Sequence, residues 1–99
     1  MNANTKLQLL QDIYPDSAEL DQILEKLLSV ALTEQQQRLQ RYDRDIHSFE
    51  ENYQMESGDF YERFEAGELG DDADFFEWSG LIELRQELRD TIAQVESAA

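Results

Sequence analysis

Cysteine is absent from this sequence of 99 residues, which excludes disulfide bonds and thiolate metal sites. A single proline and four glycines leave few points at which a helix must end. No apolar run approaches the ~20 residues that a membrane-spanning helix needs, and the N-terminal residues contain no basic segment followed by an apolar one. We therefore expect a cytoplasmic protein that is stabilised by helix packing or by association.

Basic residues are also scarce, since 8 Lys and Arg face 23 Asp and Glu and the net charge is −15. Nucleic-acid binding draws much of its affinity from basic side chains that neutralise phosphates. Direct binding of DNA or RNA is therefore not expected, and neither is binding to an anionic membrane. A chain of this charge is steered toward basic protein surfaces. The alternative is that the acidity only confers solubility.

The residues that are plentiful favour helix. Leu, Glu, Gln, Asp and Ala dominate, β-branched residues are sparse, and 40% of the chain is apolar, with ten aromatic residues. This composition predicts a folded, all-α protein with no sheet. A chain of this length allows one domain, over residues 1–99.

A long helix is expected over residues 16–54. Asp16 can accept hydrogen bonds from the first turn, and Glu19 three residues later completes a capping-box pattern. A second pattern of this kind begins at Thr33, so a break near residue 33 is an alternative. Residues 1–15 should form a short N-terminal helix or arm that ends before the single proline.

Two shorter helices are expected after the long one. Ser57 can cap a helix over residues 57–66, and the glycine that follows can end it in a left-handed conformation. The last helix is expected over residues 71–97, with Asp71 or Asp72 as its N-cap.

Apolar residues recur at alternating spacings of three and four along the long helix and the last helix. The stripe of the long helix contains Leu24, Leu28, Ala31 or Leu32, Gln35, Leu39, Tyr42, Ile46, Phe49 and Tyr53, and that of the last helix contains Phe75, Trp78, Leu81 or Ile82, Arg85, Leu88, Ile92 and Val95. The two helices should form a coiled-coil-like antiparallel hairpin, joined by the short connecting helix. The long helix would be roughly 55 Å long at 1.5 Å per residue, too long for the rest of the chain to cover. We therefore expect a homodimer or higher oligomer through these stripes.

The long helix contains two features that could be taken for catalytic or binding residues. His47 is the only histidine and lies beside the apolar stripe with no serine placed for activation, so we expect a surface residue and no nucleophilic catalysis. Arg38, Arg41 and Arg44 form a small basic stripe. Salt bridges with acids of the same helix are the expected use, and pairing across subunits is the alternative.

The segment from Phe60 to Trp78 is the densest feature of the sequence, because acids and large aromatics alternate there around two glycines. Interface cores favour aromatic anchors, and charged rims select the partner. The rings of Phe75, Phe76 and Trp78 span too much of a helix circumference for one intramolecular stripe. The alternative is that Phe75 and Trp78 are core residues and Phe76 packs under the preceding loop. The acids lack the spacing of an EF-hand loop, so no metal site and no cofactor are expected.

One run of this segment carries a family resemblance. It reads Phe60-Tyr61-Glu62-Arg63-Phe64-Glu65-Ala66-Gly67-Glu68-Leu69-Gly70-Asp71-Asp72, followed by Asp74-Phe75, Glu77-Trp78 and Leu81. Residues 49–89 resemble the small acidic helical proteins encoded beside bacterial toxins of the TumE family. The resemblance implies the antitoxin of a toxin–antitoxin pair, a protein that is not an enzyme and that binds and blocks a basic toxin, expected to be a ribonuclease. The candidate partner-binding residues are Phe60, Tyr61, Phe64, Glu68, Asp71, Asp72, Asp74, Phe75, Phe76 and Trp78.

Two other functions are compatible with the sequence. Glu62 and Glu65, followed by Glu87 and Asp90, formally resemble the E-x-x-E and E-x-x-D motifs with which MazG-type nucleoside triphosphate pyrophosphohydrolases hold Mg²⁺. In a chain with 23 acids, however, several pairs at this spacing arise from composition alone. The second alternative is a coiled-coil assembly protein whose oligomeric state is its whole function.

Overall fold

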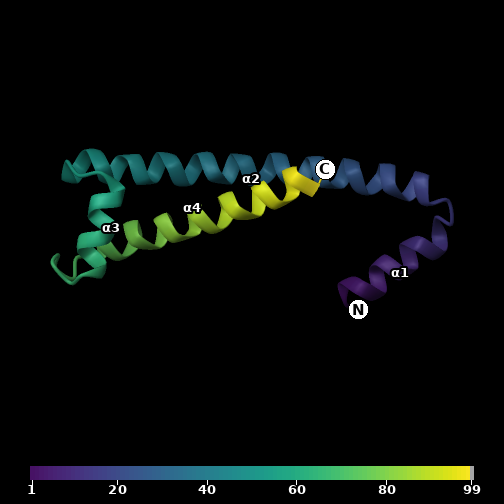
Figure 1. The fold of residues 1–99 in the computed structure, drawn as a ribbon, viewed down its shortest axis with the longest axis horizontal. Helices are drawn as coiled ribbons and strands as arrows, with labels where there is room; N and C mark the ends of the chain where they lie inside the picture. Colours follow the sequence, from purple (N-terminus) through teal and green to yellow (C-terminus); the bar gives the residue numbers. More distant parts are fainter. Residues whose placement is uncertain (99) are drawn as a thin grey trace.

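The computed structural model describes residues 1–98, which form four α-helices and no strand. The helices are α1 (Ala3–Ile13), α2 (Ser17–Tyr53), α3 (Ser57–Glu65) and α4 (Ala73–Ala98). Figure 1 shows that α2 and α4 run antiparallel as a long hairpin, that α3 lies across the end where the hairpin closes, and that α1 folds back beside the start of α2. The predicted all-α hairpin is confirmed. No helix within the described residues is long and apolar enough to cross a membrane.

The long helix α2 begins where the sequence predicted and is not broken. The side chain of Asp16 accepts a hydrogen bond from the backbone N–H of Ala18 at 3.0 Å, which satisfies one of the free donors of the first turn. The helix continues through Thr33, whose hydroxyl donates to the carbonyl of Ser29 at 3.1 Å. The alternative of a break near residue 33 is therefore wrong.

The start of α3 differs from the prediction. Glu56 is the N-cap residue and makes no capping hydrogen bond with its side chain, whereas Ser57 is the first residue of the helix. The hydroxyl of Ser57 instead accepts a hydrogen bond from the indole N–H of Trp78. Ser57 is thus used in a tertiary contact, and the prediction that it caps α3 is wrong.

The connection from α3 to α4 follows the predicted turn signals. Gly67 has a φ of 75°, a left-handed conformation that glycine adopts without steric cost. The next residue, Glu68, donates its N–H to the carbonyl of Arg63 at 3.0 Å, which satisfies a carbonyl at the end of α3. Of the two candidate caps of α4, Asp72 accepts from the N–H of Asp74 at 2.9 Å.

An aromatic core fills the closed end of the hairpin. Its centre consists of Ile46 from α2, Phe60 from α3 and Trp78 from α4, each at most 1% exposed. The rings of Phe60 and Trp78 stack at a centroid distance of 3.8 Å and an interplanar angle of 3°. The partly buried residues packed around this centre are Phe49, Tyr53, Met55, Tyr61, Phe64, Leu69, Phe75, Leu81 and Ile82. The core therefore depends on three helices.

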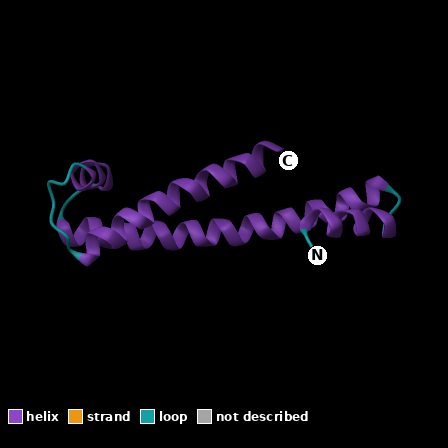
Figure 2. Ribbon diagram, turned by 90° about the horizontal axis from the view of Figure 1, so that it is seen from below, coloured by secondary structure: helices purple, strands orange, loops and turns teal. Residues whose placement is uncertain are grey.

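The opposite, open end of the hairpin is thinly covered. Leu88 and Ile92 of α4 are buried there, but Leu28 of α2 is 53% exposed although it belongs to the predicted stripe. Helix α1 contributes no buried residue. Figures 1 and 2 together show that α4 crosses α2 at an angle, because the C-terminal part of α4 lies against α2 in one view and apart from it in the other. Two helices alone do not enclose their apolar stripes at this end.

Candidate protein-binding site

The structure divides the segment from Phe60 to Trp78 into a buried part and an exposed part. Phe60 and Trp78 are fully buried. Four of the other predicted residues are partly buried, namely Tyr61, Phe64, Asp74 and Phe75. The remaining four are exposed, namely Glu68, Asp71, Asp72 and Phe76. The side chains of Phe60 and Trp78 cannot contact a partner in this conformation, so the partner-binding role predicted for them is corrected to one of support.

Trp78 and Phe75 need no partner protein to cover them, because helices approach them from two sides. Trp78 stacks on Phe49 of α2 at 5.7 Å, in addition to Phe60 of α3. The ring of Phe75 lies 5.2 Å from that of Tyr53 of α2 and 5.6 Å from that of Phe60. One neighbouring helix could not cover both rings, but α2 and α3 together do so. Both residues belong to the core, as the alternative interpretation proposed.

Phe76 is the ring that the fold leaves outside. It is 58% exposed and therefore does not pack under the preceding loop. The ring contacts Phe64 of α3 at a centroid distance of 5.2 Å and an interplanar angle of 89°, an edge-to-face arrangement that aromatic pairs favour. The result is an aromatic side chain that is presented to solvent at the start of α4 and contacts the fold on one side.

Acidic residues are frequent in the sequence on both sides of this exposed ring. Residues 59–77 contain eight acids and a single base, Arg63, and Arg63 lies 3.5 Å from the carboxylate of Glu68. We define the acidic patch as the exposed acids of the α3–α4 turn and of the start of α4, together with the exposed ring among them. Its residues are Glu68, Asp71, Asp72, Phe76 and Glu77.

Two tyrosines form hydrogen bonds with acidic side chains at the closed end of the hairpin. The hydroxyl of Tyr53 donates to Asp74 at 2.6 Å, and that of Tyr61 donates to Glu83 at 2.8 Å. The hydrogen bond to Asp74, together with desolvation, raises the pKa of Tyr53 to about 12. The bond to Glu83 raises the pKa of Tyr61 in the same way. Asp74 is therefore engaged within the fold and is a weaker candidate for contact with a partner.

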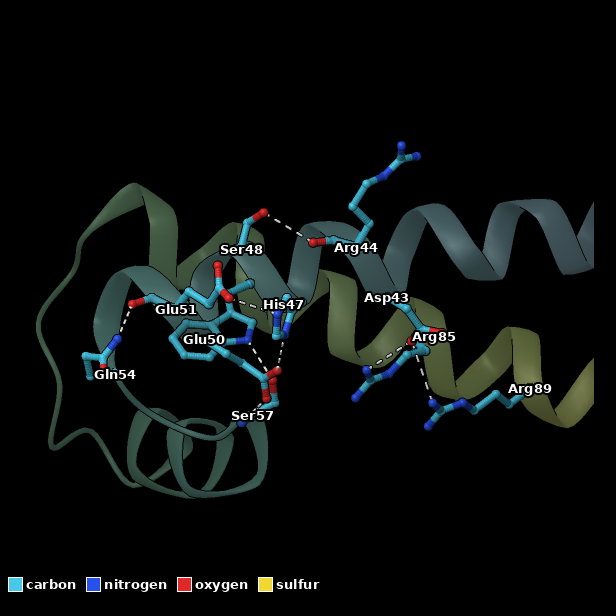
Figure 3. Close-up of polar contacts among 11 residues, drawn as sticks. Asp43, Arg44, His47, Ser48, Glu50, Glu51, Gln54, Ser57, Arg85 and Arg89 are labelled. Carbon is cyan, nitrogen blue, oxygen red and sulfur yellow. Dashed lines mark hydrogen bonds and ion pairs between the residues drawn. The ribbon is translucent and has the colours of Figure 1, made fainter.

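A polar network connects Trp78 of the core to α2 and α3, and no pattern in the sequence predicted it. The indole N–H of Trp78 donates to the hydroxyl of Ser57 at 3.0 Å, and the N–H of Ser57 donates to Glu50 at 2.9 Å (Figure 3). Burial alone would raise the pKa of Glu50, but the hydrogen bonds from Ser57, with His47 and Arg85 nearby, lower it. The bonded residues lie 21 and 7 positions apart, so no periodic pattern could indicate them.

The charged residues of α2 pair differently from the prediction. Asp43 lies 3.2 Å from Arg85 and 3.6 Å from Arg89, both on α4 (Figure 3). Within residues 1–98, no carboxylate lies within 4.0 Å of the basic stripe Arg38, Arg41 and Arg44. The predicted salt bridges within the long helix are not formed there, since Asp43 faces the other arm of the hairpin. His47 is exposed, as expected.

The carboxylates of the pyrophosphohydrolase alternative do not form a cluster. Glu62 and Glu65 lie on α3, and Glu87 and Asp90 lie on the later part of α4. In the part of the chain that the structure describes, no group of three or more His, Asp or Glu side chains could hold a metal ion. The arrangement required to bind Mg²⁺ in that mechanism is not present among these residues.

Comparison of this chain with protein-family models, with curated proteins and with solved structures finds no match. The candidate site is defined by the acidic patch itself. Its components are one exposed aromatic ring that contacts Phe64, and the exposed acids near it in the sequence.

Proposed function

We propose that the protein is an antitoxin-like inhibitor, which binds and neutralises a basic toxin, a ribonuclease, through the acidic patch. The observation that carries this proposal is the exposed ring of Phe76 among acids at a well-packed end of the fold. The resemblance of residues 49–89 to antitoxins encoded beside TumE-family toxins supports the same function.

Phe76 supplies the apolar part of the binding energy. Aromatic side chains are enriched among the residues that dominate interface energetics, and they bind best when little freedom is lost on association. The contact with Phe64 already restricts the ring before a partner arrives. Insertion of Phe76 into a pocket of the toxin would therefore remove a large apolar surface from water at a low cost in side-chain entropy.

The acids supply selectivity and a route to inhibition. A ribonuclease needs Lys and Arg at its RNA-binding surface to neutralise phosphates. The carboxylates of Asp71, Asp72 and Glu77 are exposed and present negative charge to the same kind of surface. Electrostatic attraction accelerates the encounter of such partners, and the bound inhibitor would exclude RNA from the surface it covers.

Co-expression with the basic protein encoded next to this chain tests the proposal. The wild-type pair should co-purify, and the complex should not cleave RNA. Asp71→Lys and Phe76→Ala should each weaken binding about tenfold or more, as measured by calorimetry. Asp72 is left unchanged because it caps α4, so that its loss would disturb the fold itself.

Asp45→Lys is the matched control, since it makes the same change of charge at an exposed position of α2. Circular dichroism should show unchanged helix content in all three variants. The proposal fails if wild-type protein does not bind the neighbouring basic protein, or if Asp71→Lys binds it as tightly as Asp45→Lys does.

A further inference from the structure

An apolar groove lies between α2 and α4 at the open end of the hairpin. Its volume is about 440 Å³. The larger apolar residues that line it are Leu28, Leu32 and Tyr42 from α2, and Leu84, Leu88 and Ile92 from α4. This part of α4 is separate from the acidic patch, so the inference does not depend on the proposed function.

The groove exposes leucines of both helices. Leu28, which belongs to the stripe of α2, is 53% exposed, and Leu84, which lies beside the stripe of α4, is 46% exposed. At the closed end α3 supplies a third layer over the hairpin, whereas at the open end no helix of the described chain does so (Figure 1). A third and a fourth helix placed over the groove would complete a four-helix bundle.

We propose that a second copy of this chain occupies the groove, with α2 of each copy lying against α4 of the other in a symmetric four-helix bundle. The stripes on α2 and α4 then continue from the intrachain contact into the contact between copies. The α2 residues that line the groove, from Leu28 to Tyr42, span about 21 Å. With a width of roughly 20 Å for two adjacent helices, two such faces bury about 800 Å² in total, which is a small interface, so a second copy is favoured mainly by the charges in the groove.

The charges in the groove also favour a second copy. One base, Arg38, lines it from α2, and one acid, Glu87, lines it from α4. Within residues 1–98 neither forms an ion pair. Across a two-fold axis, if one residue contacts a second residue of the partner copy, the same contact forms again with the two copies exchanged. Arg38 of one copy would therefore face Glu87 of the other, twice in each dimer.

The register of the hairpin makes this pairing reachable. Asp43 contacts Arg85 and Arg89, which places Glu87 about level with Asp43 on α2. Arg38 then lies five residues, about 7.5 Å along the helix axis, from that level. A long arginine side chain spans this offset. The groove is thus self-complementary in charge, although each chain as a whole is strongly acidic.

Light scattering of the isolated chain during size-exclusion chromatography tests the dimer. The wild-type mass should be twice the chain mass of 11.6 kDa at concentrations of tens of micromolar. Leu28→Asp should give a monomer with unchanged helix content. Leu27→Asp is the matched control, because Leu27 is 58% exposed but does not line the groove, and this variant should remain a dimer. A monomeric wild type, a larger assembly, or equal effects of the two substitutions would overturn the proposal.

The charge pairing has a sharper test that uses mixed variants. Arg38→Glu alone and Glu87→Lys alone should each weaken the dimer at least tenfold, since each places like charges together at both pairs. An equimolar mixture of the two variants restores opposite charges at both pairs and should form a heterodimer. An effect confined to the single chain could not be rescued in this way. Failure of the mixture to associate, or single variants that dimerise like wild type, would refute the assigned geometry.

Discussion

The two ends of the hairpin contain the same kinds of helix and differ in what covers them. At the closed end Ile46, Phe60 and Trp78 are each at most 1% exposed, whereas at the open end Leu28 and Leu84 remain about half exposed. Both regions follow the same three-and-four spacing of apolar residues. The difference arises from α3, which adds a third layer at one end only. A regular apolar stripe thus creates the possibility of a core, and the number of layers decides whether water is excluded.

This contrast separates two uses of apolar surface. Aromatic residues of the closed end pack against one another across three helices, and Phe64 of this group contacts the exposed ring of Phe76. Apolar residues of the open end remain available for association with another chain. Substitutions at the two ends should therefore act on different properties, stability at the closed end and assembly at the open end.

The largest effect is expected from Trp78→Ala. Loss of a fully buried large aromatic should lower the free energy of unfolding by about 3–5 kcal/mol, a large share of the stability of a domain of this size. Phe76→Ala is the control on the same helix, and it should cost less than about 1 kcal/mol because the ring is mostly exposed. Urea unfolding followed by circular dichroism measures both. Similar losses from the two variants would contradict the division between core and surface.

The two ends can be compared directly by replacing one buried isoleucine at each end with alanine. Such truncations lower the free energy of unfolding by about 2–5 kcal/mol. The loss for Ile46→Ala at the closed end should lie in the upper part of this range, and the loss for Ile92→Ala at the open end should lie in the lower part. The site of Ile92 borders the groove, so its surroundings can relax into the space. Urea unfolding at several protein concentrations gives both values. The contrast between the ends is wrong if Ile92→Ala costs as much as Ile46→Ala in monomeric protein.

Removal of the hydrogen bond between Trp78 and Ser57 should cause the next largest loss of stability. Ser57→Ala leaves the buried indole N–H without its acceptor, and an unsatisfied buried donor costs about 1–3 kcal/mol. Ser48→Ala is the control, since the hydroxyl of Ser48 is exposed and bonds only to a carbonyl of its own helix. That variant should change stability by less than about 0.5 kcal/mol. Equal unfolding midpoints for the two variants would show that the network contributes nothing to the closed end.

Alkaline pH should cause a smaller loss of stability, through the ionisation of Tyr53 at the closed end. The hydrogen bond to Asp74 raises the pKa of Tyr53 to about 12, whereas an unfolded tyrosine ionises near pH 10. The folded state therefore retains a proton that the unfolded state loses. This contribution to stability is complete below about pH 10 and disappears as the pH rises toward 12.

Unfolding measured from pH 8 to 11.5 should thus show a steeper loss of stability in wild type than in Tyr53→Phe. Asp74→Asn removes the charged acceptor and should shift the ionisation of Tyr53, followed by ultraviolet absorbance, back toward its ordinary range. An unchanged titration in Asp74→Asn would mean that this hydrogen bond does not set the pKa of Tyr53.

Several features could be predicted from the sequence because they depend on neighbours within a turn or two. Asp16 and Asp72 cap the helices that follow them, and Gly67 adopts its left-handed conformation, for local steric and hydrogen-bonding reasons. The three-and-four spacing located α2 and α4 within two residues of their observed bounds. Ser57 is the instructive failure, because its pattern is that of a cap while its hydroxyl serves Trp78, 21 residues away.

The sequence by itself therefore determined an all-helical hairpin with an acidic, aromatic segment near its turn, because helix propensity, capping and periodicity act over short distances. Only the tertiary structure decided which aromatics of that segment are buried. Trp78 and Phe75 are covered because α2 and α3 approach from two sides, and Phe76 is left exposed beside the acids. The same packing left Leu28 and Leu84 in an open groove, since α3 covers the hairpin at one end alone. Burial depends on how many elements meet at a point in space, a quantity that the spacing of residues along one helix does not contain.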